Sequence, residues 1–138
     1  MSNATLSNRL ETVLNHPLHQ HLGISTLHAE NGDGQLSLTI GQNAINPSGA
    51  FHGGVLYLLA DVCAYCGLLS LLDEHQEAVT HDIQVSVLRS ATLGDEVTLE
   101  SQVLKLGKRI AFMEVKAMCN GKLIASAKVT KSLISTKA

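Results

Sequence analysis

Residues 46–61 read NPSGAFHGGVLYLLAD, in which a turn and two glycines lead into a long apolar run that ends on one carboxylate. Asn46-Pro47-Ser48 favours a turn, and Gly53-Gly54 lets the backbone approach a ligand closely where a helix begins. The first N–H groups of a helix are unpaired and carry a partial positive charge, which suits an oxygen that becomes negative during a reaction. The turn at Gly53 is therefore a candidate oxyanion-binding site.

Asp61 lies about two helical turns further on, in apolar surroundings that penalise an ionised carboxylate unless a neighbouring group stabilises it. We favour a functional acid over a structural one that bonds a neighbouring helix or a partner subunit. Two turns separate Gly53 and Asp61 by about 12 Å along the axis, too far for both to contact one reacting carbonyl.

The apolar run extends from Val55 to Leu72, and only Asp61 and Ser70 within it are strongly polar. A helix that is apolar on every side is either buried in a core or spans a membrane. At roughly 27 Å this helix approaches the thickness of a bilayer core. However, a carboxylate at mid-span costs about 2.5 to 3.5 kcal/mol on insertion scales, and no basic flank is present. We therefore expect a core helix.

The remaining chain predicts one short helix and an antiparallel sheet. Apolar residues at helical spacing predict a helix over residues 5–15, a lid or edge element that ends before Pro17. A turn at residues 31–34 joins a hairpin. Four long strands follow within residues 77–89, 95–107, 109–119 and 122–135. One face of these strands is apolar and expected to be buried; it includes Ile83, Val85, Val87, Val97, Leu99, Ser101 and Val103.

The pattern predicts one α+β domain over residues 1–138, with an N-terminal helical segment over residues 1–17. The chain has 45% hydrophobic residues, a formal net charge of −2 and no basic run, which argues against disorder and against a nucleic-acid partner. No secretory signal pattern opens the sequence, so we expect a cytoplasmic protein. Cys63, Cys66 and Cys119 are an odd set in aliphatic surroundings, and we expect reduced core thiols in preference to a redox C-x-x-C pair.

Two other chemistries are considered and set aside. His16, His19 and His21 flank Pro17 without a Cys, Asp or Glu at ligand spacing, so we expect a mobile polar segment and propose no metal. No serine lies in a G-x-S-x-G elbow, which leaves the serine-hydrolase route unsupported.

A sheet wrapped around a central helix is the hotdog fold, and the sequence resembles the PaaI-like acyl-CoA thioesterases of that superfamily. The resemblance covers about Leu18 to Ser135 and implies a long central helix wrapped by a five- to six-stranded antiparallel sheet. Two positions depart from the family pattern: Ser90 replaces a usual proline, and His81 a usual apolar residue. The residues that carry the likeness are Asn46, Gly49, His52-Gly53-Gly54, Leu59-Ala60-Asp61, Leu88-Arg89, Gly94-Asp95 and Asn120-Gly121-Lys122.

The resemblance implies hydrolysis of acyl-CoA thioesters to a free acid and CoA. Gly53 N–H would bind the thioester oxygen beside Gly54, and Asn46 would orient the substrate or the attacking water. Asp61 would be either the general base or the nucleophile, two alternatives that the sequence does not separate. His52 would hydrogen-bond near the thioester or only orient the turn.

The same resemblance implies a hydroxyl near the water at Thr80, and no cofactor apart from the CoA of the substrate. Arg89, Lys108 and Arg109 are candidates for the CoA phosphates, although exposed basic residues mostly face solvent. Hotdog thioesterases are dimers in which the glycine turn of one chain faces the acid of the other, so we expect a homodimer, with a dimer of dimers plausible. A non-catalytic acyl-CoA sensor is the alternative function, and the acyl group stays open.

Overall fold

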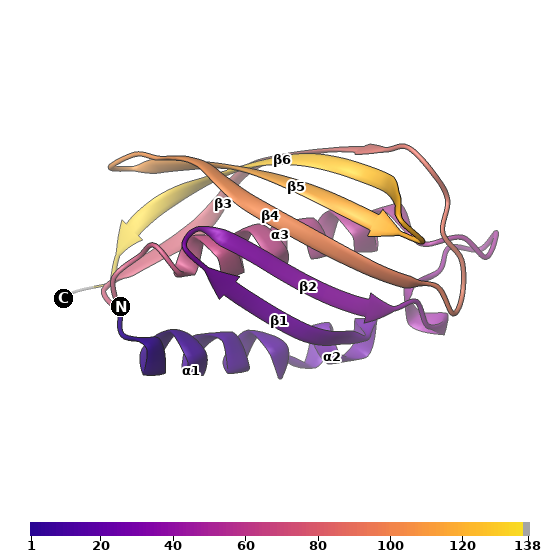
Figure 1. The fold of residues 1–138 in the computed structure, drawn as a ribbon, viewed down its shortest axis with the longest axis horizontal. Coiled ribbons are helices and arrows are strands. Elements are labelled where there is room, and N and C mark those ends of the chain that lie inside the picture. Colours follow the sequence, from indigo (N-terminus) through magenta and orange to yellow (C-terminus); the bar gives the residue numbers. More distant parts are fainter. Residues whose placement is uncertain (137–138) are drawn as a thin grey trace.

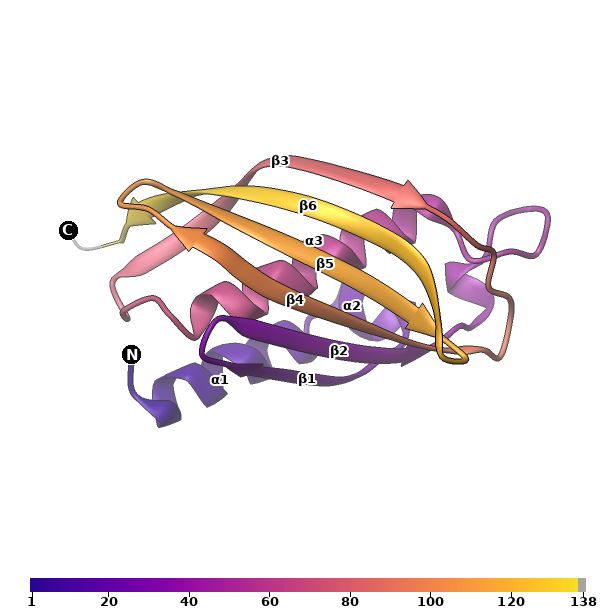
Figure 2. The same ribbon diagram turned by 45° about the horizontal axis from the view of Figure 1, so that its top comes forward.

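The computed structural model describes residues 1–136 and contains one sheet that curves around a central helix (Figures 1 and 2). All six strands pair in an antiparallel manner, in the order β1-β2-β4-β5-β6-β3. This arrangement confirms the predicted α+β hotdog fold. In chain order the elements are α1 (Asn3–Leu14), α2 (Pro17–Leu22), β1 (Ile24–Glu30), β2 (Asp33–Thr39), the 3-10 turn η1 (Gln42–Ala44), α3 (Gly53–Leu69), β3 (Gln76–Val87), β4 (Glu96–Leu106), β5 (Ile110–Cys119) and β6 (Lys122–Ser135).

Two Asn-Gly pairs make the tight turns of the sheet. Asn31 and Gly32 connect β1 to β2 with φ values of 49° and 87°, and Asn120 and Gly121 connect β5 to β6 with φ values of 53° and 73°. Two successive residues with positive φ twist a hairpin in the same sense as its strands, and Asn and Gly tolerate that backbone best. The predicted hairpin turns are confirmed at both places.

Helix α3 packs against the concave face of the sheet and forms most of the core with it. Leu59, Cys63 and Leu68 are fully buried, as are Leu36 and Leu99 on the facing strands. Within residues 1–136, no helix has both the length and the apolarity needed to span a bilayer.

The helix and β2 approach each other more closely than a side chain would permit. A Cβ atom on Gly34 would lie 2.5 Å from the Cys63 carbonyl oxygen and 2.8 Å from the Gly67 nitrogen. At this crossing the buried Ser101 hydroxyl donates a hydrogen bond of 2.9 Å to the Cys63 carbonyl. Glycine at residue 34 is therefore required by space, and it sets the position of α3 on the sheet.

The segment around Pro17 forms helix α2, so the expectation of a mobile polar segment is wrong. His16 caps this helix, because its Nδ1 accepts a hydrogen bond from Leu18 N–H, and Pro17 occupies the first turn. His19 Nδ1 lies 2.7 Å from the Val13 carbonyl oxygen, which ties α2 to α1. A proline is favourable at a helix start, where its missing N–H has no partner to lose. The following strand consequently begins at Ile24.

The two edges of the sheet differ in their protection. Helices α1 and α2 lie against β1 at one edge (Figure 1). The other edge is β3, which pairs only with β6 among the described residues. Val97, Leu99 and Ser101 are buried as predicted, but Val87 on β3 is 53% exposed in the single chain. An unpaired strand edge with exposed apolar residues is a surface suited to association.

Candidate active site

The first turn of α3 carries the predicted glycine pair, and the two N–H groups differ in their partners. Gly54 N–H donates a 2.9 Å hydrogen bond to Nδ1 of His52, which caps the helix. Gly53 N–H has no hydrogen-bond partner within residues 1–136. Because Nδ1 of His52 accepts a hydrogen bond, the neutral ring carries its proton on Nε2. This turn therefore offers two donors to a ligand, the Gly53 N–H and the exposed His52 Nε2–H.

The loop before α3 is organised by Asn46. Its Oδ1 accepts hydrogen bonds from Ser48 N–H at 2.9 Å and from Ala50 N–H at 3.0 Å. Gly49 has a φ of 89°, which the tight loop requires. Since Oδ1 of Asn46 is committed to the loop, only its side-chain NH₂ remains to contact a substrate or water.

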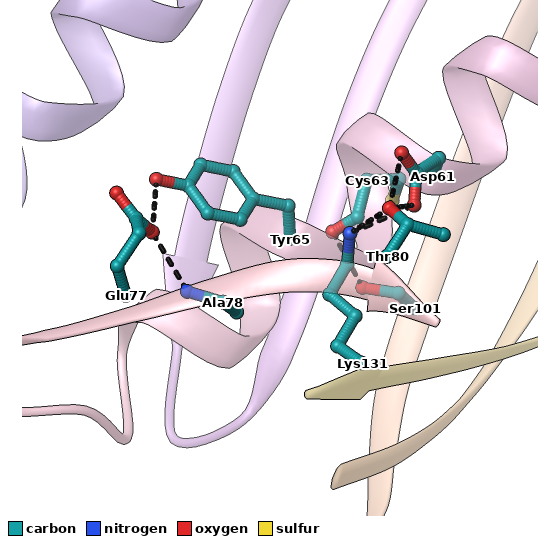
Figure 3. A network of polar contacts seen from close by, with 8 residues as sticks. All are labelled: Asp61, Cys63, Tyr65, Glu77, Ala78, Thr80, Ser101 and Lys131. Carbon is teal, nitrogen blue, oxygen red and sulfur yellow. Dashed lines mark hydrogen bonds and ion pairs between the residues drawn. The ribbon is translucent and has the colours of Figure 1, made fainter. Parts of the chain in front are cut away.

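Asp61 lies at the surface of the same helix and is bound by two side chains of the sheet (Figure 3). The Thr80 hydroxyl lies 2.8 Å and 2.9 Å from its two oxygens. Lys131 Nζ donates to Asp61 Oδ1 at 2.7 Å and to Thr80 Oγ1 at 3.0 Å. The side chain of Lys131 is 3% exposed and that of Asp61 33% exposed. The carboxylate therefore lies between a buried cation and an open face of the chain.

Sequence reasoning missed Lys131, although a signal was present. Residues 125–133 of β6 alternate, and every second position except residue 131 is Ala, Val or Leu. The structure pairs Lys131 with Thr80 across β3 and β6, on the face that covers α3. A lysine at an inward position of an alternating strand needs a partner, and that requirement could have identified it.

The polar network continues from Lys131 past Tyr65 to Glu77 (Figure 3), and from Glu77 to Arg9 on the N-terminal helix. Lys131 Nζ lies 5.5 Å from the centroid of the Tyr65 ring, and the Tyr65 hydroxyl donates to Glu77 Oε1 at 2.7 Å. Arg9 on α1 forms a 2.9 Å ion pair with the other oxygen of Glu77. Burial raises the pKa of Tyr65 to about 12, and the Glu77 carboxylate adds to this rise while Arg9 opposes it. Tyr65 therefore stays neutral and serves as a hydrogen-bond donor at neutral pH.

The cysteines of α3 take no part in this site. Cys63 and Cys66 are fully buried and free, which confirms the expectation of reduced core thiols. Burial raises the pKa of each thiol to about 12. A protonated thiol is a poor nucleophile, so neither cysteine is suited to attack a substrate at neutral pH.

Gly53 and Asp61, the two main residues of the predicted site, do not meet within one chain. Gly53 and Asp61 are separated by two turns of α3, about 12 Å at 1.5 Å per residue. Arg89 is exposed on the loop after β3, and its backbone N–H bonds the Ile124 carbonyl. The single chain thus holds the glycine turn and Asp61 at two separate places along α3. Apolar side chains close to these residues in the sequence are also exposed, among them Tyr57 at 43% and Leu88 at 56%.

The wrapped helix, the glycine turn at its start and the acid two turns later define a hotdog thioesterase. The family model described as "Thioesterase superfamily" matches residues 48–126, a segment that contains α3 with Gly53 and Asp61. The chain belongs to the thioesterase superfamily, in its PaaI-like branch, and is a thioester hydrolase.

Relatives and solved structures agree with this assignment. Acyl-coenzyme A thioesterase 13 of Homo sapiens is 30% identical over 112 residues, covering 80% of this chain and 79% of the relative. A thioesterase structure from Haemophilus influenzae superposes with a TM-score of 0.85 at 25% identity, covering 96% of this chain and 92% of that one. A mutant of the phenylacetic acid degradation protein PaaI from Thermus thermophilus has a TM-score of 0.77 at 25% identity, with coverage of 85% and 98%.

Proposed function

We propose that the protein hydrolyses acyl-CoA thioesters to a free acid and CoA, with Asp61 as the acting carboxylate. The observation that carries the proposal is Asp61 itself, a partly exposed acid held by Thr80 and Lys131 on the helix that begins at the unpaired Gly53 N–H. The human relative is named as an acyl-coenzyme A thioesterase, which supports CoA as the leaving group.

We further propose that each site forms between two copies of the chain. One chain holds Gly53 and Asp61 too far apart to contact the same carbonyl. The unpaired edge of β3 and the exposed Val87, Leu88 and Tyr57 support a two-fold contact in this region. An isologous dimer would bring the glycine turn of each chain to Asp61 of its partner and complete two sites at once.

In this arrangement the Gly53 N–H binds the thioester oxygen and stabilises the negative charge that develops on it. His52 Nε2–H and the NH₂ of Asn46 supply further donors near the acyl group. Asp61 then acts in one of two ways. As a base it takes a proton from water, whose oxygen bonds the carbonyl carbon while the C–S bond breaks. As a nucleophile it forms a mixed anhydride, which water then hydrolyses. The CoA thiolate takes up a proton in either case.

The test is Asp61→Asn, which keeps the shape of the side chain and removes its basicity. We expect kcat for thiol release from acyl-CoA esters to fall by about two orders of magnitude or more, with acyl-CoA binding retained. Asp82→Asn is the matched control, because Asp82 is exposed on β3 just beyond the site. A folded Asp61→Asn protein with near wild-type turnover would refute the assignment. Tight acyl-CoA binding without turnover by the wild-type protein would instead indicate a sensor.

A further inference from the structure

We propose that Lys131 is a positioning residue for the reaction, which fixes Oδ1 of Asp61 and the Thr80 hydroxyl so that Oδ2 is left to act on the substrate. The inference rests on the proposed function only in taking Asp61 as the acting carboxylate. Lys131 is assigned from the geometry of β3, β6 and α3 (Figure 3).

The ammonium of Lys131 has three N–H groups, and the structure shows three neighbouring groups around it. It contacts Asp61 Oδ1 at 2.7 Å, Thr80 Oγ1 at 3.0 Å and the face of the Tyr65 ring at 5.5 Å from its centroid. A buried ammonium that lacks such partners costs several kcal/mol. Lys128, three residues earlier on the same strand, is exposed and belongs to the opposite face of β6. Lys131 is therefore specifically matched to the carboxylate site.

The donor and acceptor chemistry sets the direction of each hydrogen bond. Lysine only donates, so Thr80 Oγ1 accepts from Lys131 and directs its single hydrogen toward Asp61. Oδ1 of Asp61 receives the Lys131 bond, whereas Oδ2 has no hydrogen-bond or ion-pair partner other than that hydroxyl within residues 1–136. Oδ2 consequently keeps free lone pairs, either to accept a proton from water or to attack the thioester carbon.

The burial of Lys131 separates this role from substrate binding. Its side chain is 3% exposed and lies behind a carboxylate that is 33% exposed, so an acyl-CoA reaching Asp61 does not reach the ammonium. Loss of the ammonium should release the carboxylate from its orientation and lower kcat by about 10- to 100-fold, within the range seen for misplaced catalytic groups. KM should change by no more than about threefold.

The experiment compares Lys131→Met, Asp61→Asn, the double variant and the control Lys128→Met on the same acyl-CoA substrate. If Lys131 acts through Asp61, Lys131→Met lowers kcat in the wild-type background and has little further effect once Asp61 is Asn. Lys128→Met should match wild type. As a second readout, n-propylammonium should raise kcat of a Lys131→Ala variant and leave that of Asp61→Asn unchanged.

Several results would overturn the inference. A folded Lys131→Met protein with wild-type kcat, or an equal further loss in the Asp61→Asn background, would show that Lys131 does not act through the acid. If Lys131→Met does not fold but the double variant does, the lysine is needed as the partner of the Asp61 carboxylate, which supports the inference. If neither variant folds, the lysine only stabilises the fold and the inference is wrong. Unchanged turnover of Asp61→Asn would refute the proposed function, whereas a slow Asp61→Asn beside a fully active Lys131→Met would refute only this inference.

Discussion

The hydroxyl oxygen of Thr80 lies 2.8 Å and 2.9 Å from the two carboxylate oxygens of Asp61, across the gap between β3 and α3. The family resemblance alone implies that Thr80 supplies a hydroxyl near the attacking water. In the structure this hydroxyl donates to the acid itself, because Lys131 Nζ occupies the acceptor side of Oγ1. The β3 strand bulges directly after Thr80, between residues 80 and 82, which shifts the register with β6 at the site.

Thr80→Val should lower kcat by about 10- to 100-fold, because a hydrogen bond to a charged group contributes about 1.5 to 3 kcal/mol and each 1.36 kcal/mol corresponds to a tenfold change in rate. Valine keeps the β-branched shape that suits a strand. Steady-state assays of thiol release measure the effect. Thr80→Ser keeps the hydroxyl and should stay within a few-fold of wild type, as should Thr26→Val at an exposed position of β1. Equal losses for valine and serine at residue 80 would show that the hydroxyl is unimportant.

Val87→Lys should convert the proposed dimer to a monomer, because it places a charge on the inner face of the unpaired edge strand, where Val87 is 53% exposed. If each site forms between two chains, as proposed, kcat/KM should fall at least tenfold together with the dimer fraction. Sedimentation and thiol-release assays at the same micromolar concentration test both. Leu104→Lys on β4 is the control, since that leucine is 50% exposed away from the β3 edge. A fully active monomer would remove the basis for a composite site.

Stability should fall above pH 9. Burial raises the pKa of the Cys63 and Cys66 thiols from 9.0 to about 12, so between these values the unfolded chain releases protons that the folded chain retains. The contribution of the two thiols to the free energy of unfolding is complete below pH 9 and is lost as the pH rises toward 12. The loss is about 1.4 kcal/mol per thiol at pH 10. Urea unfolding at pH 8 and pH 10 measures the difference. Cys66→Ala should flatten this dependence while lowering stability at both pH values; an unchanged slope would contradict the assignment.

The elements of the fold follow from local patterns in the sequence. The Asn-Gly pairs predict both tight turns because few other residues tolerate two successive positive φ values, and the apolar run after Gly53 predicts a fully buried helix. Helix α2 was missed because its six residues are too few to show a period. Its start depends on a histidine cap and on Pro17 in the first turn.

The candidate site also contains residues that local sequence patterns predict and residues that they do not. Gly53, His52 and Asp61 were identified from the sequence because a glycine turn at a helix start and a lone acid in an apolar run are local signals. The partners of Asp61 were decided only by the tertiary structure. Thr80 and Lys131 are 51 residues apart and meet through the register of β3 and β6, and Lys131 is 70 residues from Asp61. No local pattern encodes that register, because it results from the packing of the whole sheet around α3, and it places a lysine from the last strand against the acid of the central helix.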